Sequence, residues 1–252
     1  MRTLWLAILM VAAEPSRGNL LPNGDFEKGA NTPAGWQTVD GLTSFWVKEG
    51  DDAHGMVLKF DTSLVQSQAY EWWEKILHGA SPKDAPAKKP FVGPGYDTLA
   101  GLDGVWFYSD AVEIQPAKAY WLTLDVKGPG EMMVWLLGYT KKPDLTFGGE
   151  ALAFRGWLGD KNGTRDPQRN HRRLFNEYDW KGQLKAGPAD VWKTFSRREK
   201  PFRPTQQTPQ VRYVRVLLLP LWPPGIYYVD NVRLTEVSDP AATKRLSGSD
   251  ER

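Results

Sequence analysis

The sequence of 252 residues contains no cysteine. Disulfide bonds, thiolate nucleophiles, thiolate metal ligands and a lipidated cysteine are therefore excluded. Because small secreted domains of eukaryotes are often rich in disulfides, an exported chain without cysteine favours a bacterial source.

Histidine is also scarce, with only His54, His78 and His171 present. None of them belongs to an HxxxH or HExxH pair, and no GxSxG sequence accompanies them, so the patterns typical of zinc proteases and serine hydrolases are missing. Hydrolysis of a glycoside would need two carboxylates at a set separation across a cleft. Nothing in the sequence pairs its carboxylates in this way, and we therefore predict a protein that binds a ligand without catalysis.

The chain has no marked excess of one charge. Its 32 Lys and Arg residues nearly balance 30 Asp and Glu residues, which gives a net charge of +2. Nucleic-acid-binding domains usually show a stronger basic field. After the N-terminal segment, no apolar stretch reaches the length of a membrane-spanning helix. The sequence therefore predicts neither a nucleic-acid partner nor a membrane span.

The N-terminal segment has the pattern of an export signal. Arg2 is followed by an apolar run, Leu4–Ala13, which is too short to cross a bilayer. Val11-Ala12-Ala13 has the small-residue shape of a signal-peptidase site. We therefore predict a signal peptide at residues 1–13 and an exported mature chain, extracellular or periplasmic, that begins at Glu14. The alternative is a buried first strand or helix.

What the chain does have is a heavy load of aromatic and turn-forming residues. The 12 Trp, 10 Phe and 9 Tyr residues, together with 19 Pro and 24 Gly, favour β structure with long loops. One segment, Val65–Leu77, has the three- and four-residue apolar spacing of a helix. The runs that are typical of strands are Met56–Phe60, Gly104–Ile114, Tyr120–Lys127, Glu131–Tyr139, Val211–Leu219 and Ile226–Val237.

These elements predict one β domain, residues 14–237, with two long loop insertions. The first insertion covers about residues 66–103 and contains the helix, and the second covers about residues 141–190. Loops of this length inside a compact domain are usually functional or mobile. The small and charged residues 238–252 predict a disordered tail.

Two motifs at opposite ends of the chain carry a family resemblance. The first is Asn19–Glu27 (NLLPNGDFE), followed by Pro33–Trp36 (PAGW), and the second is Tyr227–Leu234 (YYVDNVRL). Together they resemble the bacterial carbohydrate-binding modules of the galactose-binding-like jelly-roll superfamily. Ile114–Tyr120 and Asp190–Lys193 are similar to segments of the same modules. The resemblance implies an all-β jelly-roll sandwich.

The resemblance also implies a structural calcium ion held by Glu27 and Asp230, with Asp25 as a further candidate. A jelly roll places the N- and C-terminal strands together, so Glu27 and Asp230 are expected to lie close to each other. Ca²⁺ takes 6–8 oxygen ligands, and neighbouring carbonyl groups can supply the remainder. In the alternative, Glu27 caps local backbone and Asp230 pairs with an arginine.

A sugar site needs flat aromatic faces and a few fixed polar groups. In Tyr120–Lys127 the alternation predicts that the even positions face the core and that Trp121, Thr123, Asp125 and Lys127 face outward. Trp121 beside Asp125 is therefore our first candidate for ligand binding. In the alternative, Trp121 lies under an insertion as hidden core.

The run Met132–Tyr139 is apolar on both faces, so its alternation does not decide which residues face outward. Trp135 and Tyr139 are candidate ligand residues if they face outward beneath a loop, and the loop residues Arg155 and Trp157 are candidates for the rim of a cleft. Trp36 and Trp192 are expected to pack in the core.

We therefore predict an exported, non-catalytic protein that binds a poly- or oligosaccharide through exposed aromatic residues. Two alternatives remain open. One is a β-sandwich that binds another protein or a cell surface, and the other is a glycan-active enzyme that uses carboxylates of the inserted loops.

Overall fold

The structure is a computed structural model. It describes residues 18–51, 53–89, 91–115, 118–130, 132–139, 142–143, 171–176, 190–196 and 212–237. The predicted signal peptide, the predicted tail, and the candidate ligand residues Arg155 and Trp157 lie outside these ranges.

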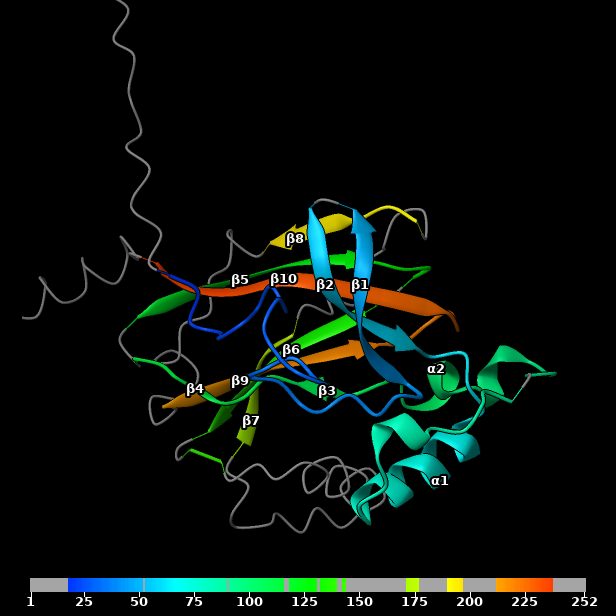
Figure 1. Cartoon of the computed structure of the whole chain (residues 1–252). Coiled ribbons are helices and arrows are strands. Elements are labelled where there is room, and N and C mark those ends of the chain that lie inside the picture. The colour runs from blue at the N-terminus through cyan, green and yellow to red at the C-terminus, as the bar shows by residue number, and fades with distance from the viewer. Residues whose placement is uncertain are drawn as a thin grey trace, which may run out of the picture.

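The chain folds into two antiparallel sheets packed face to face (Figure 1), so the prediction of an all-β sandwich is confirmed. We name each sheet after one of its inner strands, β5 or β6. The β5 sheet has the strand order β1 (Ser44–Asp51), β2 (His54–Asp61), β10 (Ile226–Val237), β5 (Ala119–Lys127) and β8 (Lys193–Ser196). The β6 sheet has the order β3 (Phe107–Tyr108), β9 (Tyr213–Pro220), β6 (Met132–Tyr139) and β7 (His171–Asn176), and β4 (Val112–Glu113) also pairs with β9.

The hydrophobic core lies between the two sheets. On β5, Tyr120, Leu122, Leu124 and Val126 are buried while the residues between them are half-buried, which confirms the predicted alternation. Val134 and Leu136 of β6 and the even positions of β9 meet them from the other sheet. Trp36 is also in this core, as predicted. We call the face of each sheet that points away from this core its outer face.

The predicted run Gly104–Ile114 is wrong as a single strand, because the structure divides it into β3 and β4. Between them, Ser109, Asp110 and Ala111 stand opposite only Val216 and Arg215 of β9. This extra residue is a bulge, in which the Arg215 side chain donates a hydrogen bond from Nε to the Ser109 carbonyl at 2.6 Å.

Three strands of the structure, β1, β7 and β8, are absent from the predicted strand runs. Each of them ends the order of described strands in its sheet. β7 falls within the second predicted insertion. The prediction of a loop alone is therefore wrong for this segment, because it contains a strand that pairs with β6.

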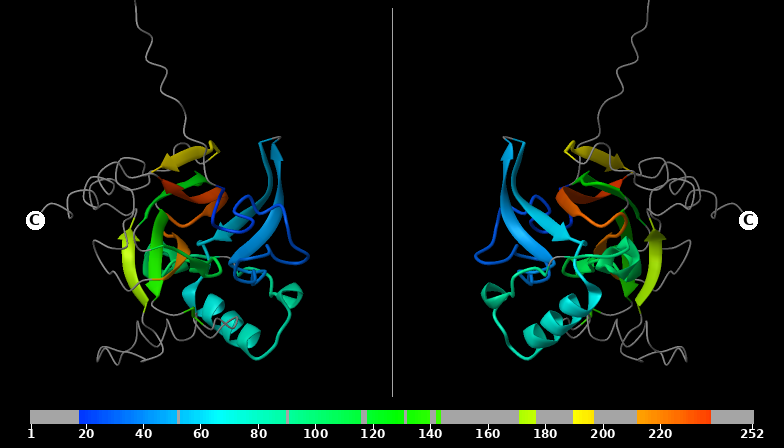
Figure 2. Two further views of the ribbon diagram at one scale, coloured as in Figure 1. Left: turned by 90° about the vertical axis from the view of Figure 1, so that its left-hand side faces the viewer. Right: turned by 90° about the vertical axis from the view of Figure 1, so that its right-hand side faces the viewer.

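The first insertion is helical, as predicted, and contains α1 (Gln66–Leu77), α2 (Leu99–Leu102) and two short 3-10 turns, Pro82–Asp84 and Gly95–Asp97. α1 buries Ala69, Trp72 and Ile76, which share one helix face. No helix in the described part of the chain is long and apolar enough to cross a membrane. The side views show the helices and β8 on opposite sides of the molecule (Figure 2). The first insertion therefore leaves the outer face near β8 uncovered.

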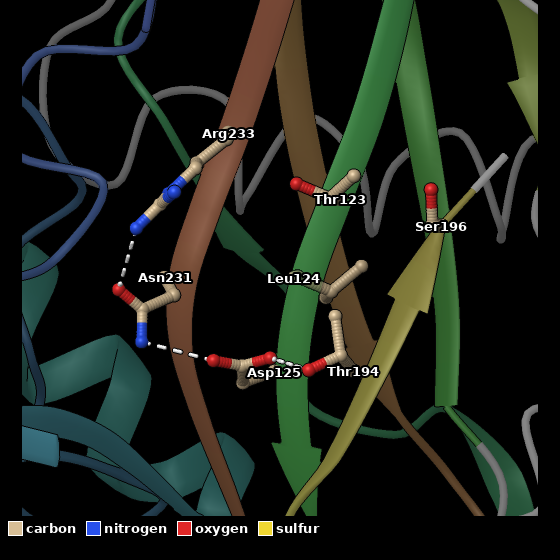
Figure 3. Close-up of a pocket in the computed structure, with 7 residues that line it drawn as sticks. All are labelled: Thr123, Leu124, Asp125, Thr194, Ser196, Asn231 and Arg233. Carbon is tan, nitrogen blue, oxygen red and sulfur yellow. Dashed lines mark hydrogen bonds between the residues drawn. The ribbon is translucent and has the colours of Figure 1, made fainter. Parts of the chain in front are cut away.

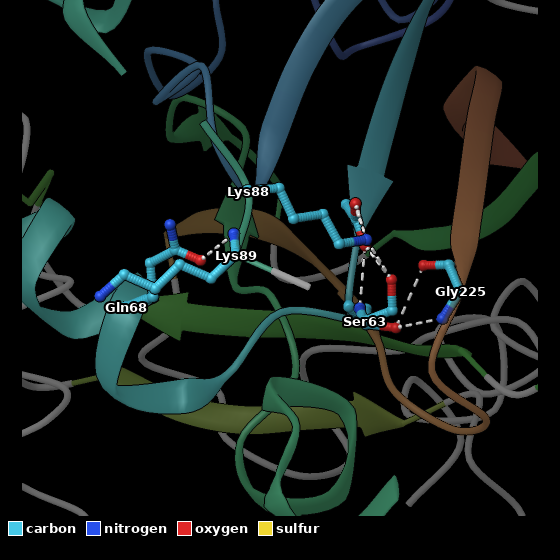
Figure 4. Close-up of polar contacts among 7 residues, drawn as sticks. Ser63, Gln68, Lys88, Lys89 and Gly225 are labelled. Carbon is cyan, nitrogen blue, oxygen red and sulfur yellow. Dashed lines mark hydrogen bonds and ion pairs between the residues drawn. The ribbon is translucent and has the colours of Figure 1, made fainter. Parts of the chain in front are cut away.

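A polar network ties residues 87–89 of this insertion to the sandwich (Figure 4). Gln68 of α1 donates from Nε2 to the Ala87 carbonyl at 2.9 Å and accepts from the Lys89 backbone N–H at 3.1 Å. The Lys88 ammonium group is 2.7 Å from Oδ2 of Asp61, at the end of β2. The insertion is thus bound to the fold by both hydrophobic packing and charged hydrogen bonds.

Candidate functional site

The two ends of the domain are joined by the side chain of Asn19. Its Oδ1 accepts hydrogen bonds from the N–H groups of Leu21 and Leu234 at 3.1 and 2.9 Å, and its Nδ2 donates to the Val232 carbonyl at 2.8 Å. Backbone bonds from Leu20 N to Leu234 O and from Val232 N to Gly24 O continue the contact. The first motif therefore lies directly against the closing strand β10, as the jelly-roll prediction requires.

A bulge in β10 shapes the outer face of the β5 sheet. The register of β10 against β5 shifts between Asp230 and Arg233, and Asn231 adopts a positive φ of 52°. Val229 and Val232 remain in the core on either side of the bulge. The extra residue therefore allows the adjacent side chains of Asp230 and Asn231 to lie on the same outer side of the sheet.

Asp230 is a buried carboxylic acid with acidic neighbours. Its side chain is only 2% exposed. Burial is the main cause that raises the pKa of Asp230 from 3.8 to about 7. The charges of Asp125 and Glu27 act in the same direction, and the hydrogen bond from Asn231 N–H and the charge of His54 oppose them. Among the described residues, no ion pair joins Asp230 to an arginine, in contrast to the alternative considered above.

Glu27 lies near this acid from the N-terminal loop. Its Oε1 accepts a hydrogen bond from Met56 N–H at 2.8 Å, so Glu27 does cap local backbone, at the start of β2. Asp25 is exposed, and no described contact joins it to Glu27 or Asp230. Within the described ranges, no group of three or more His, Asp or Glu side chains converges as a metal site. A cation here would need backbone oxygens in addition to Glu27 and Asp230.

A cavity of about 450 Å³ opens on the outer face of the β5 sheet beside the bulge (Figure 3). The strand register explains its lining, because Arg233, Thr123 and Ser196 form one row across β10, β5 and β8, and Asp230, Asp125 and Thr194 form the next. The complete lining is Thr123, Leu124, Asp125, Thr194, Ser196, Asn231 and Arg233.

Asp125 is the centre of the polar contacts in this cavity. It accepts hydrogen bonds from the Thr194 hydroxyl at 2.5 Å and from Asn231 Nδ2 at 2.9 Å, and His54 Nε2 lies 3.5 Å from its Oδ2. Arg233 is exposed, and its guanidinium lies 3.5 Å from Oδ1 of Asn231. The cavity therefore offers a fixed carboxylate, hydroxyl groups and an accessible guanidinium side by side.

Aromatic residues flank the cavity at both ends of β5. Trp121 lies two positions before Thr123 on the same outer face and is half-buried. At the other end, the Lys127 ammonium group lies 4.6 Å from the centre of the Tyr228 ring and 5.1 Å from the Trp192 ring. The prediction that Trp192 lies in the core is wrong. Its ring is half-buried on the outer face and stacks on His54 at 4.0 Å, because it directly precedes the edge strand β8.

The structure does not bring all the predicted ligand residues together. Asp125 and Trp121 share the outer face of the β5 sheet, whereas Trp135 and Tyr139 lie on the outer face of the β6 sheet, across the core. There Tyr139 is buried in a cluster with Tyr108, and Trp135 packs against Trp106 edge to face at 5.6 Å. Trp135 and Tyr139 therefore cannot line the same cavity as Asp125.

Sequence reasoning missed several cavity residues. Asn231 and Arg233 were predictable as outward residues from the alternation in the closing motif, but nothing marked them as ligand residues. Thr194 and Ser196 belong to β8, whose register against β5 joins residues separated by about 70 positions in the sequence. No local pattern reveals such a pairing.

The sequence matches no known protein-family profile and no curated protein. Among solved structures, the chain is similar to a CBM4 module, with 12% identity, coverage of 86% of this chain and 99% of the other, and a TM-score of 0.40. It is similar to a candidate sugar-binding protein of Bacteroides thetaiotaomicron, with 13% identity, coverage of 87% and 100%, and a TM-score of 0.42. It is also similar to a CBM61 module in complex with β-1,4-galactotriose, with 14% identity, coverage of 88% and 100%, and a TM-score of 0.41.

Proposed function

We propose that this chain is a non-catalytic carbohydrate-binding protein that acts outside the cell and holds a glycan along the outer face of the β5 sheet. The observation that carries the proposal is the polar cavity around Asp125, with Trp121 at one end of β5 and the Trp192–Tyr228 pair at the other. Sugars are bound by this combination, since aromatic rings contact their apolar faces and polar groups meet their hydroxyls.

The dimensions of this face favour an oligosaccharide over a single sugar. Outward side chains on a strand recur every two residues, so Trp121 and Lys127 lie roughly 20 Å apart along β5. Asp125 can accept hydrogen bonds from sugar hydroxyls, and Arg233 can donate them. Hydrolysis would require a second carboxylate. Asp125 is the one acidic residue in the described lining, and its neighbour Asp230 is buried and does not line the cavity, which favours binding over catalysis.

Replacement of a polar cavity residue is expected to weaken glycan binding strongly. Arg233→Ala and Asp125→Ala each remove a charged hydrogen-bonding group, so we expect roughly 10- to 100-fold weaker association. Isothermal titration against oligosaccharides derived from plant, algal and microbial polysaccharides would measure this loss.

The matched control is Arg212→Ala, which removes an exposed arginine at the start of β9 in the other sheet. This variant is expected to bind as the wild type does. If the folded wild-type protein binds no glycan in such a panel, or if Arg233→Ala and Asp125→Ala bind normally, the proposal is wrong.

We also propose a structural calcium ion at the junction of the chain ends, with Glu27 and Asp230 as its side-chain ligands. Both carboxylates interact electrostatically in the structure, and Asp230 is buried in an acidic setting that a cation would neutralise. Hard oxygen ligands of this kind suit Ca²⁺, and main-chain carbonyl groups of the adjoining loop would complete the coordination. The ion would stabilise the junction and take no part in glycan chemistry.

Calcium is therefore expected to raise the thermal unfolding temperature of the wild-type protein, and EDTA is expected to reverse the change. At a concentration 100 times its dissociation constant, a ligand of the folded state adds about 3 kcal/mol to the free energy of unfolding. Glu27→Gln should lose most of this gain, and Asp25→Asn will decide whether Asp25 contributes. An unfolding temperature that does not respond to millimolar calcium would exclude the site.

A further inference from the structure

Two aromatic side chains that face solvent, Tyr96 and Trp222, lie side by side. Among the described residues, the exposed large hydrophobics are Val92 at 94%, Tyr96 at 70%, Val191 at 46% and Trp222 at 38%. The rings of Tyr96 and Trp222 stack at a centroid distance of 5.5 Å and an interplanar angle of 12°. Tyr96 comes from the first insertion and Trp222 from the β9–β10 loop, so two distant segments together build one exposed aromatic pair.

The backbone that carries this pair is closely held. Gly95 packs so near the Trp222 ring that a Cβ atom at this position would lie 3.0 Å from Cη2. The Thr98 N–H and hydroxyl both donate to the Gly95 carbonyl, at 3.2 and 2.5 Å. In the β9–β10 loop, Gly225 N–H donates to the Thr62 hydroxyl at 3.1 Å. The two rings are thus ordered before any ligand arrives, which reduces the entropy cost of binding.

The size and openness of the pair limit what it can bind. Two fully accessible aromatic side chains offer at most about 500 Å² of contact surface. Tyr96 and Trp222 are only partly accessible and therefore offer less. A stable protein interface needs about 800 Å² on each partner. An apolar small molecule would prefer a concave pocket that covers most of its surface. A sugar ring fits an open platform, because its apolar face contacts the aromatic ring while its hydroxyl groups stay in water.

We propose that the Tyr96–Trp222 pair is a second saccharide-binding site, in which a pyranose ring of a polysaccharide stacks on the exposed face of Tyr96. Asp97 follows Tyr96 in the sequence and is exposed, and its carboxylate can accept hydrogen bonds from sugar hydroxyls. The site shares no residue with the cavity around Asp125, so it can be tested independently of the function proposed for the β5 sheet. Two sites on one small domain would increase retention on an insoluble polysaccharide through avidity.

Adsorption isotherms of the full chain on insoluble cellulose, xylan and β-1,4-galactan test this proposal. Tyr96→Ala is expected to bind roughly three- to tenfold more weakly than the wild type on at least one of these polymers, which is the scale of one aromatic contact. Tyr96→Phe keeps the ring and is expected to bind within twofold of the wild type. Val92→Ala removes an exposed apolar side chain without a ring and should have no effect.

A comparison of Arg233→Ala with Tyr96→Ala separates the two proposed sites. If Arg233→Ala loses binding and Tyr96→Ala does not, the Tyr96 site is excluded and the β5-sheet function stands. If Tyr96→Ala loses binding and Arg233→Ala does not, the reverse holds. Equal losses for Tyr96→Phe and Tyr96→Ala would overturn ring stacking. A wild-type dimer in sedimentation velocity that Tyr96→Ala dissociates would show that the pair contacts a second copy of the chain, and would also overturn the proposal.

Discussion

Asp230→Asn is expected to raise the free energy of unfolding at pH 8, in calcium-free buffer, by up to about 4 kcal/mol, because the pKa of Asp230 rises from 3.8 to about 7 on folding. The folded protein binds this proton more tightly than the unfolded chain does. The resulting stabilisation is complete below pH 3.8 and is lost as the pH rises through about 7. Asn cannot ionise, and its Oδ1 can still accept the hydrogen bond from Asn231 N–H.

Urea unfolding of wild type and Asp230→Asn at intervals from pH 4 to pH 8 would measure this effect. The difference between the two proteins should be small at pH 4 and grow toward pH 8. Asp25→Asn, which replaces an exposed acid in the N-terminal loop, should follow the wild type in the calcium-free series. If Asp230→Asn is less stable than the wild type at pH 8 without calcium, then ionisation of Asp230 does not destabilise the folded protein, and the prediction is wrong. With saturating calcium the order should reverse, since the ion requires the carboxylate.

Asn19→Ala is expected to lower the free energy of unfolding by about 3 kcal/mol. The substitution removes three hydrogen bonds, to Leu21 N, Leu234 N and Val232 O, and leaves backbone groups at the junction of the chain ends without partners. The loss should appear as a lower urea midpoint with an unchanged m-value. Lys28→Ala, an exposed change in the same loop, is the control and should be neutral. A loss below about 0.5 kcal/mol, the lower limit for a single hydrogen bond, would show that the junction does not depend on Asn19.

The predictable parts of the fold were those with a strong local pattern. The alternation of Tyr120, Leu122 and Leu124 identified the buried face of β5, and the spacing of Ala69, Trp72 and Ile76 identified the helix of the first insertion. β1 and β7, each the last described strand of its sheet, were not predicted because their sequences do not alternate regularly between apolar and polar residues. The bulge at Ser109–Ala111 divides a segment whose composition predicted one continuous strand.

The candidate site was predicted in part, for a geometric reason. Alternation tells whether a side chain points into the core or away from it, but it does not tell to which sheet the strand belongs. Trp121, as predicted, and Trp135, whose direction the sequence left open, both point away from the core, yet they lie on opposite sides of the sandwich. The partners of Asp125 come from β8 and from the bulge of β10, and both depend on pairing between distant segments.

One wall of the cavity belongs to a short strand that ends the order of described strands in its sheet. Thr194 and Ser196 lie on this strand, β8, which pairs with β5 over four residues. Terminal, short strands open at lower free energy than central ones. Ligand affinity would then be set by the fraction of molecules in which β8 is docked, in addition to the contacts themselves. Sequence changes in β8 that never touch a sugar could therefore tune how tightly the protein holds it.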